Sequence, residues 1–455
     1  MLNADIRTLS NGLRVVLLDV PHVHSASCAL MVRSGPRYER PEENGIAHLV
    51  EHLLFRGTRS HPSSFDFHVA VESLGGEING LTQRDATTIH ITVPPQHLEA
   101  GLSLLGEVST EPLLTGLAVE RDVVVEEILD SLDAEGHDLD LDSISRRILW
   151  GDHPMAFPVA GDLELVESLT EAECRAFHRR FYTARNSVLV VAGPLEPNRV
   201  HQWAQQAFSR MTEGAEIPDP PAPKPRSRLP IHVQPTDDAQ VSALLTFPAP
   251  HENHDDFGRL MVLRRILDDG FASRLRQAIC EQRGLAYSLS VGVDAYRDAG
   301  AFDIEVACTP KKLFGAIEQM LDTLEGLKAD PVQTDELERA KTRHLADLQF
   351  ALDDPNELCG WYGASALMNV QKSAEAQQKE ILEVRPDDLL HFANRLFRRE
   401  DALLTLVGPV DERSTYRLER LLNRPAESTV WLGQDLEGED EVMLENAEGP
   451  RLIAG

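Results

Sequence analysis

The chain lacks several features that would each point to a particular class of protein. Its five cysteines are scattered and none belongs to a C-x-x-C pair, so neither a disulfide framework nor a thiolate zinc site is indicated. No stretch approaches the roughly 18 consecutive apolar residues of a membrane helix. The first residues, MLNADIRTLSNGLRVVLLDV, also do not follow the pattern of a secretory signal. We therefore expect a cytoplasmic protein with reduced thiols and no membrane partner.

Basic residues are scarce as well. The sequence has 44 Lys and Arg against 74 Asp and Glu, a formal net charge of -30. Nucleic-acid phosphates demand the opposite sign, so we do not expect a nucleic-acid partner. Two interpretations of the acidic excess stay open: it keeps the protein soluble, or it favours basic ligands.

A proline-rich stretch divides the chain into two parts of similar length. Residues 214–231, GAEIPDPPAPKPRSRLPI, contain six prolines in a polar setting, which favours an extended spacer. We predict an N-terminal domain over 1–213, a linker over 214–230 and a second domain over 231–423. The acidic tail over 424–455 is weakly apolar, which favours partial disorder, with Trp431 as a residue that could dock back onto the body.

The two parts repeat one pattern. AFHRRFYTARNSVLVVAGPL at 176–195 aligns without gaps with HFANRLFRREDALLTLVGPV at 391–410, at a constant offset of 215. In each copy, apolar or aromatic residues four apart predict an amphipathic helix, and a short apolar run before Gly-Pro predicts a buried strand. We therefore expect two copies of one α+β unit.

The pattern within the first part supports this fold class. It predicts a pair of strands at 8–20 and 25–35, a helix over 44–57, a second strand pair within 75–95 and a helix over 97–110. Such an irregular alternation is typical of a mostly antiparallel sheet packed with helices. The expected fold is two homologous α+β domains joined by the proline-rich linker.

HLVEH, at 48–52, is a candidate metal-binding motif. On a helix, His48 and His52 lie four residues apart on one face and can share a cation, with Glu51 beside them. Imidazole suits zinc, and a hydrolytic zinc site needs three protein ligands and an open position for water. The motif also arises by chance in roughly one such chain in twenty, so two helix-surface histidines are the alternative.

A third ligand is available in AVERDVVVEEILDSLD, at 118–133. Its valines and isoleucine predict a helix with an apolar face. On that helix Glu120 and Glu127 lie two turns apart on one side, whereas Glu126 points about 100° away. Glu127 as the third ligand with Glu120 behind it is one possibility, and carboxylates that only solvate the outer face of the helix are the other.

Together these segments resemble the pitrilysin and insulinase family of inverted zinc metallopeptidases, in the branch of mitochondrial processing peptidase and half-length bacterial relatives. The resemblance rests on GIAHLVEHLLFRGT, on ERDVVVEE, whose last Glu follows His52 by 75 residues, on LSNGLRVVL, on GGEINGLTQRD and on FASRLRQAICEQRGLAYSL. It implies one Zn2+ per chain held by His48, His52 and Glu127. It also implies that Glu51 is the general base and that Glu120 is an additional acidic site residue.

The same resemblance implies a way to bind substrate. The strand formed by Asn79, Gly80, Leu81 and Thr82 is expected to pair with an extended peptide. Members of the family also have an Arg and, seven residues later, a Tyr that contact substrate. Here Tyr287 is kept, but Cys280 stands at the Arg position and cannot supply a guanidinium. Arg276 and Arg283 flank it, and a core tyrosine is an equal alternative for Tyr287.

The expected function is a zinc-dependent endopeptidase that cleaves peptides or unfolded precursor or leader segments inside a closed chamber. The resemblance implies four domains per chamber, so we expect a heterodimer in which a homologous subunit supplies an Arg/Tyr pair, or otherwise a homodimer. The acidic run 130–142 would favour basic peptides if it lines the chamber, and a solvated loop is the alternative. A non-catalytic scaffold or assembly subunit of the same fold is the rival function.

Overall fold

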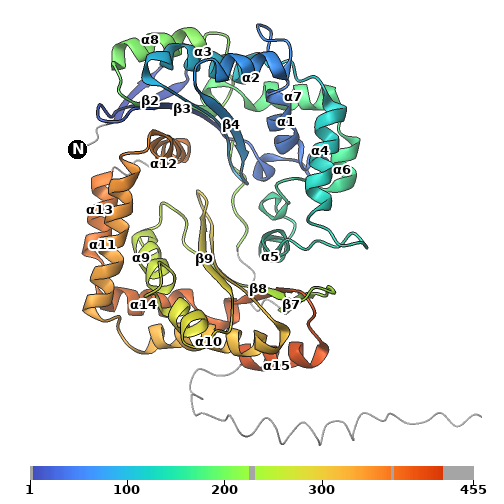
Figure 1. Cartoon of the computed structure of the whole chain (residues 1–455), viewed down its shortest axis with the longest axis vertical. Helices are drawn as coiled ribbons and strands as arrows, with labels where there is room; N and C mark the ends of the chain where they lie inside the picture. The colour runs from blue at the N-terminus through green and yellow to red at the C-terminus, as the bar shows by residue number, and fades with distance from the viewer. Residues whose placement is uncertain (1–3, 225–230, 370–373, 424–455) are drawn as a thin grey trace, which may run out of the picture.

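The computed structural model describes residues 4–224, 231–369 and 374–423. The first half of the chain, blue to green in Figure 1, forms the upper part of the molecule, and the second half, yellow to red, forms the lower part. Residues 225–230 of the predicted linker and the tail 424–455, with Trp431, lie outside the described residues. In the described ranges, none of the helices has both the length and the apolar character required to span a bilayer.

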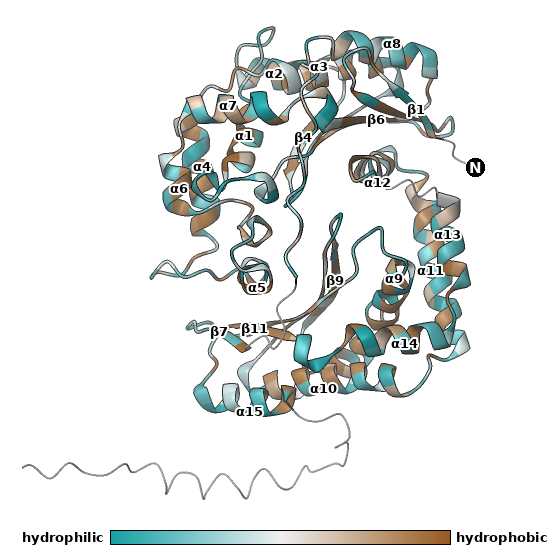
Figure 2. Cartoon of the chain, turned by 180° about the vertical axis from the view of Figure 1, so that it is seen from behind, coloured by the Kyte–Doolittle hydropathy of each residue, from teal (hydrophilic) through white to brown (hydrophobic). Residues whose placement is uncertain are grey.

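The first half is built on a six-stranded sheet. Its order is β1-β2-β6-β3-β5-β4, and β2 runs parallel to β6 whereas the other neighbours are antiparallel. All seven residues of the central strand β6 are buried, in keeping with its apolar sequence and brown colour in Figure 2. The strands are β1 (Ala4–Thr8), β2 (Arg14–Asp19), β3 (Ala26–Val32), β4 (Glu77–Thr82), β5 (Thr87–Val93) and β6 (Ser187–Gly193).

One predicted strand pairing is wrong. Segments 8–20 and 25–35 do contain β2 and β3, but β6 lies between them, so that Leu189 pairs with Val15 on one side and with Leu30 on the other. Apolar patterning marks strands but not their partners, and here a distant segment takes the central position. The pair predicted within 75–95 is confirmed as β4 and β5, with Ile78 opposite Ile91.

The second half repeats this plan with a five-stranded sheet. Its order is β7-β11-β8-β10-β9, and β7 runs parallel to β11 as β2 does to β6. Helix α7 (Glu171–Phe181) recurs as α14 (Pro386–Leu396) at the predicted offset of 215. Two homologous α+β units are therefore confirmed. The strands are β7 (Ile231–Gln234), β8 (Val241–Pro248), β9 (Ser288–Ala295), β10 (Gly300–Cys308) and β11 (Leu403–Val407).

The helices predicted over 44–57, 97–110 and within 118–133 are confirmed as α1, α3 and α4. The helices of the first half are α1 (Ile46–Leu54), α2 (Ser64–Glu72), α3 (Leu98–Thr110), α4 (Leu117–Leu129), α5 (Leu141–Trp150), α6 (Leu163–Ser168), α7 and α8 (Pro197–Ala207). Those of the second half are α9 (Phe257–Leu267), α10 (Pro310–Ala329), α11 (Thr334–Ala351), α12 (Pro355–Leu367), α13 (Ala374–Glu383), α14 and α15 (Glu412–Leu422).

The apolar face predicted for α4 is only partly correct. Val124 and Ile128 are buried, but Val119 and Val123 are 51% and 43% exposed. The helix packs against α1 and α6, and these contacts do not cover Val119 or Val123. The remaining valines therefore reach solvent, which a sequence pattern does not reveal.

The two halves exchange helices. Helix α5 from the first half packs on β8 and β11 of the second sheet, and α12 from the second half packs on β3 and β6 of the first, as Figure 1 shows. Both contacts contain buried apolar side chains: Ile144 lies against Leu244 and Val407, and Leu358 belongs to the cluster around Val190. Each half thus completes the core of the other, which fixes their relative position.

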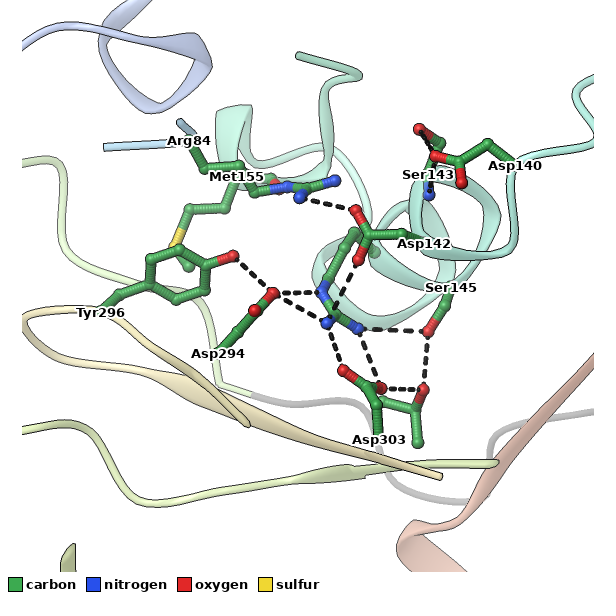
Figure 3. Close-up of polar contacts among 11 residues, drawn as sticks. Arg84, Asp140, Asp142, Ser143, Ser145, Met155, Asp294, Tyr296 and Asp303 are labelled. Carbon is green, nitrogen blue, oxygen red and sulfur yellow. Dashed lines mark hydrogen bonds and ion pairs between the residues drawn. The ribbon is translucent and has the colours of Figure 1, made fainter. Parts of the chain in front are cut away.

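A buried arginine reinforces the contact of α5 with the second sheet. The side chain of Arg146 is 1% exposed, and its Nη2 lies 2.8 Å from Asp294 of β9 and 3.2 Å from Asp142 one turn earlier, with Asp303 of β10 also in contact. Asp142 also accepts Arg84 Nη1 at 2.7 Å, from the turn after β4 (Figure 3). One charged cluster therefore joins both sheets to α5.

Candidate metal centre

Helix α1 carries the HLVEH motif with its apolar residues turned inward. It begins after Gly45, which has φ of 93°, and the side chain of Glu39 accepts the first free donors of the helix. Glu39 Oε2 accepts from the Gly45 N–H at 3.0 Å and from Asn44 Nδ2 at 2.8 Å, and Oε1 accepts from the Ala47 N–H at 2.9 Å. A buried carboxylate thus fixes the start of the helix that presents His48.

Glu39 makes stability depend on pH. Burial raises the pKa of Glu39 to about 7, although its three hydrogen bonds favour the ionised form. The unfolded chain has a glutamate pKa near about 4.3, so the folded state holds more protons between the two values. The contribution of Glu39 to the free energy of unfolding therefore falls by on the order of 3 kcal/mol as the pH rises from about 4 to about 7.

The variant Glu39→Gln tests this pH dependence of stability, because glutamine has no carboxyl group that titrates. Between pH 5 and pH 8, urea unfolding should show a larger loss of stability for the wild type than for the variant. Parallel pH profiles for the two proteins would contradict the assignment.

Three side chains from α1 and α4 meet at one point. His48 Nε2 lies 3.3 Å from His52 Nε2, and Glu127 places one oxygen 3.7 Å from His48 Nε2 and the other 3.8 Å from His52 Nε2. All three ligand atoms lie within 4.8 Å of one another. The two imidazole side chains are only 16% and 18% exposed, which contradicts the alternative of two helix-surface histidines.

This geometry fits a zinc ion. Two nitrogens that are each about 2.0–2.1 Å from a tetrahedral zinc lie about 3.3–3.4 Å apart, and the two Nε2 atoms are 3.3 Å apart. Burial and the neighbouring His52 lower the pKa of His48 to about 4. His48 is therefore neutral near pH 7 and has a lone pair to offer. Two imidazoles and a carboxylate are a donor set that zinc favours.

Glu120 lies behind the three candidate ligands. Its Oε2 is 3.2 Å from His52 Nδ1, on the side of the ring away from Nε2. A carboxylate in this place accepts a hydrogen bond from Nδ1–H and orients the ring. The arrangement is the one suggested for Glu120 by the spacing of α4, and Glu126 is exposed on another side of the same helix.

Glu51 faces the substrate strand predicted at 79–82. It is 8% exposed, its Oε2 accepts a hydrogen bond from Thr82 Oγ1 at 3.1 Å, and burial raises its pKa. Glu51, His52, Asn79, Gly80 and Glu120 are among the residues lining a pocket of about 360 Å³. The structure therefore places the candidate base, one candidate ligand and the strand at one pocket.

The strand itself has an open edge. Strand β4 is the last strand of its sheet and pairs only with β5 among the described strands. Asn79 and Leu81 are exposed, whereas Thr82 is buried against Glu51. An extended peptide can add to such an edge through its backbone.

Gly80 leaves the room that Glu51 occupies. A Cβ atom at Gly80 would lie 2.3 Å from Glu51 Oε1, so Gly80→Ala must displace the carboxylate. If Glu51 is the base, kcat/KM should fall roughly 10–100-fold with zinc content unchanged, because a shift near 1 Å has such an effect. The matched control is Gly292→Ala on β9, where an added Cβ meets nothing within 4 Å. Full activity of Gly80→Ala would contradict the role of Glu51.

The structure does not bring Tyr287 to this pocket. Tyr287 precedes β9 in the second half and is 71% exposed, which also contradicts a core tyrosine. Cys280 is half-buried on the π-helix Arg276–Glu281. Arg276 is engaged by Asp268 at 3.3 Å and by the Leu289 carbonyl at 2.9 Å, and Arg283 donates to the Ala278 carbonyl at 3.3 Å.

Two residues near the centre, Glu39 and Arg56, were not predicted from the sequence. Glu39 precedes α1 by seven residues, outside the spacing of an ordinary N-cap. Arg56 follows α1 and lies 3.1 Å from Glu120. Neither position has a local pattern that predicts its partner, because both contacts depend on how the chain folds around α1.

Comparisons with known proteins agree with this architecture. Residues 14–160 match the family model "Insulinase (Peptidase family M16)" and residues 168–343 match "Peptidase M16 inactive domain". An uncharacterized zinc protease of Mycobacterium leprae is 31% identical over 90% of this chain and 92% of its own, and one of Streptomyces coelicolor is 29% identical over 90% and 91%.

A solved structure shares the fold. A protease from Helicobacter pylori has a TM-score of 0.82 at 22% identity, over 90% of this chain and all of its own. Family models that match most of the chain, together with the relative of 31% identity, decide the family. The chain belongs to the insulinase family of peptidases, M16.

Proposed function

We propose that this protein is a zinc-dependent endopeptidase with one zinc ion per chain. The observation that carries the proposal is that the ligand atoms of His48, His52 and Glu127 lie within 4.8 Å of one another. Beside them, the buried Glu51 lies next to the open edge of strand β4. The relatives named zinc proteases support the metal and the class of reaction.

The residues have distinct chemical roles in this proposal. A zinc ion held by His48, His52 and Glu127 would polarise a peptide carbonyl and lower the pKa of water toward about 7. Glu51 takes the proton of the attacking water and passes it to the departing amine. Asn79 to Thr82 bind the substrate backbone as an added strand, which holds the peptide bond next to Glu51.

The acidic segment after α4 favours substrates that have basic side chains. Asp138, Asp140 and Asp142 line a cavity of about 730 Å³ that also contains Glu127. A lysine or arginine next to the cleaved bond would meet these carboxylates. Arg84 and Arg147 line the same cavity and neutralise part of the charge, so we infer a preference for basic peptides rather than an absolute requirement.

A second subunit completes the proposed chamber. One chain supplies two homologous units, and its own Tyr287 does not line the pocket of Glu51. We propose that this chain is the zinc-bearing subunit of a heterodimer and that a homologous subunit brings an Arg/Tyr pair, with a homodimer as the second possibility. Cys280 in the place of the Arg favours the heterodimer.

A non-catalytic scaffold or assembly subunit is the rival function. Residues 168–343, which include Cys280, match a family model described as an inactive domain, and this favours the rival. The complete set of His48, Glu51, His52 and Glu127 disfavours it, because a scaffold needs none of their chemistry.

The test is cleavage of a library of quenched basic and acidic peptides by the purified, zinc-analysed chain, alone and with a homologous subunit. We expect one zinc per chain and cleavage of basic peptides, strongest with the second subunit present. A chain without zinc and without cleavage in either form would contradict the proposal and support the scaffold.

A further inference from the structure

Arg56 contacts the metal centre through another side chain. It lies two residues beyond α1, and its Nη1 is 3.1 Å from Glu120 Oε1. The other oxygen of the same carboxylate, Oε2, is 3.2 Å from His52 Nδ1. Glu120 therefore bridges a guanidinium and a candidate zinc ligand, with one oxygen for each.

Gly116 leaves room for the guanidinium in this place. The guanidinium lies over Gly116, the residue before α4, where an added Cβ would be 3.1 Å from Arg56 Nε and 3.4 Å from Nη2. Gly116 has φ of 78° and offers no side chain, so the arginine fits flat against the start of α4. The side chains of Arg56 and Glu120 are 32% and 13% exposed, so the pair is partly shielded from water.

His48 lacks an equivalent contact. Its Nδ1 is buried and has no hydrogen-bond partner among the described residues. Of the two candidate imidazole ligands, only His52 is therefore oriented by a side chain. When His52 carries its proton on Nδ1, the N–H donates a hydrogen bond to Glu120. The lone pair on Nε2 then points toward His48 and Glu127.

We propose that Arg56 is a positioning residue of the metal centre, which fixes Glu120 and through it the orientation of His52. This inference rests on the proposed zinc site. Without Arg56, the Glu120 carboxylate can rotate away from Nδ1, and His52 then spends less time in the geometry that binds a cation.

The sign of the effect separates positioning from plain electrostatics. Arg56 carries a positive charge close to a site for a divalent cation, so the loss of that charge alone would strengthen zinc binding. The loss of an orienting contact weakens it, typically by about 10–100-fold when a partner of a ligating histidine is removed. The two explanations therefore predict opposite changes in zinc affinity.

The experiment measures the Kd of zinc for the full chain by competition with a chromophoric chelator. We expect Arg56→Gln to bind zinc about 10–100-fold more weakly, and Arg56→Lys, which keeps the charge without the planar fork, to lie between it and the wild type. The matched control is Arg59→Gln, an exposed arginine three residues away, which should bind zinc as the wild type does or slightly more tightly.

A double-mutant cycle shows whether Arg56 acts through Glu120. In a Glu120→Gln background, Arg56→Gln should change the Kd less than about 3-fold, since the bridging carboxylate is already gone. Thermal unfolding of the metal-free variants should match that of the wild type, which separates positioning from a folding defect.

Each contrary result has its own meaning. Unchanged or tighter zinc binding by Arg56→Gln, or the same loss in the Glu120→Gln background, would overturn the role of Arg56 while the zinc site stands. A wild-type chain that binds no zinc would overturn the proposed metal centre and this inference with it.

Discussion

Glu51→Gln is expected to lower kcat about 10²–10⁴-fold, the usual contribution of a general base, while one zinc ion per chain stays bound. Glutamine has the shape of glutamate but cannot take a proton from water. The candidate ligands His48, His52 and Glu127 are untouched, and the hydrogen bond from Thr82 Oγ1 can still be accepted by the amide oxygen. The measurement is kcat on a quenched basic peptide, with zinc content determined on the same sample.

Glu126→Gln is the matched control for this variant. It makes the same chemical change on an exposed residue next to Glu127, and both kcat and zinc content should stay at wild-type levels. A Glu51→Gln protein that keeps full activity would exclude Glu51 as the base. Loss of zinc from it would instead show that Glu51 helps to hold the metal.

Arg146→Met is expected to lower the free energy of unfolding by about 3–5 kcal/mol, the usual effect of breaking a buried ion pair. Methionine can fill much of the space but leaves Asp142, Asp294 and Asp303 without their shared cation. Asp294 and Asp303 then face each other without a cation, whereas Asp142 keeps its ion pair with Arg84 at 2.7 Å. The loss should appear in urea unfolding, and it should loosen the contact between α5 and the second sheet.

Arg147→Met is the control, because this neighbour is 56% exposed and pairs with Asp138 at 3.4 Å. Its loss should change stability by no more than about 1 kcal/mol. Adding Asp303→Asn to Arg146→Met should recover part of the stability, since it removes one of the repelling charges. Equal losses for the two arginine variants would show that the buried cluster in Figure 3 does not hold the halves together.

Much of the fold and of the candidate metal centre could be predicted from the sequence. The spacing of His48, Glu51 and His52 follows from helical geometry alone, because residues three and four apart share a face. The offset of 215 between the two copies holds through α7 and α14. Glu127 and Glu120 were predicted as a pair on one side of α4, and the structure places them at opposite sides of the His52 ring.

The failures of prediction share one physical cause, which is contact between segments far apart in the chain. The pairing of β2 with β3 failed because β6, more than 150 residues later, hydrogen-bonds to both. The exposed valines of α4 depend on which neighbours happen to cover that helix. The exchange of α5 and α12 between the halves has no local signature at all.

The sequence by itself determined the two copies, the helix with its paired histidines and the chemistry available to them, because these depend on residue type and on spacing within one element. Only the tertiary structure decided that Glu39 caps α1, that Arg56 reaches Glu120 and that Tyr287 lies away from the pocket of Glu51. These contacts are set by how separate elements pack, and packing depends on shape and burial across the whole chain rather than on any local pattern.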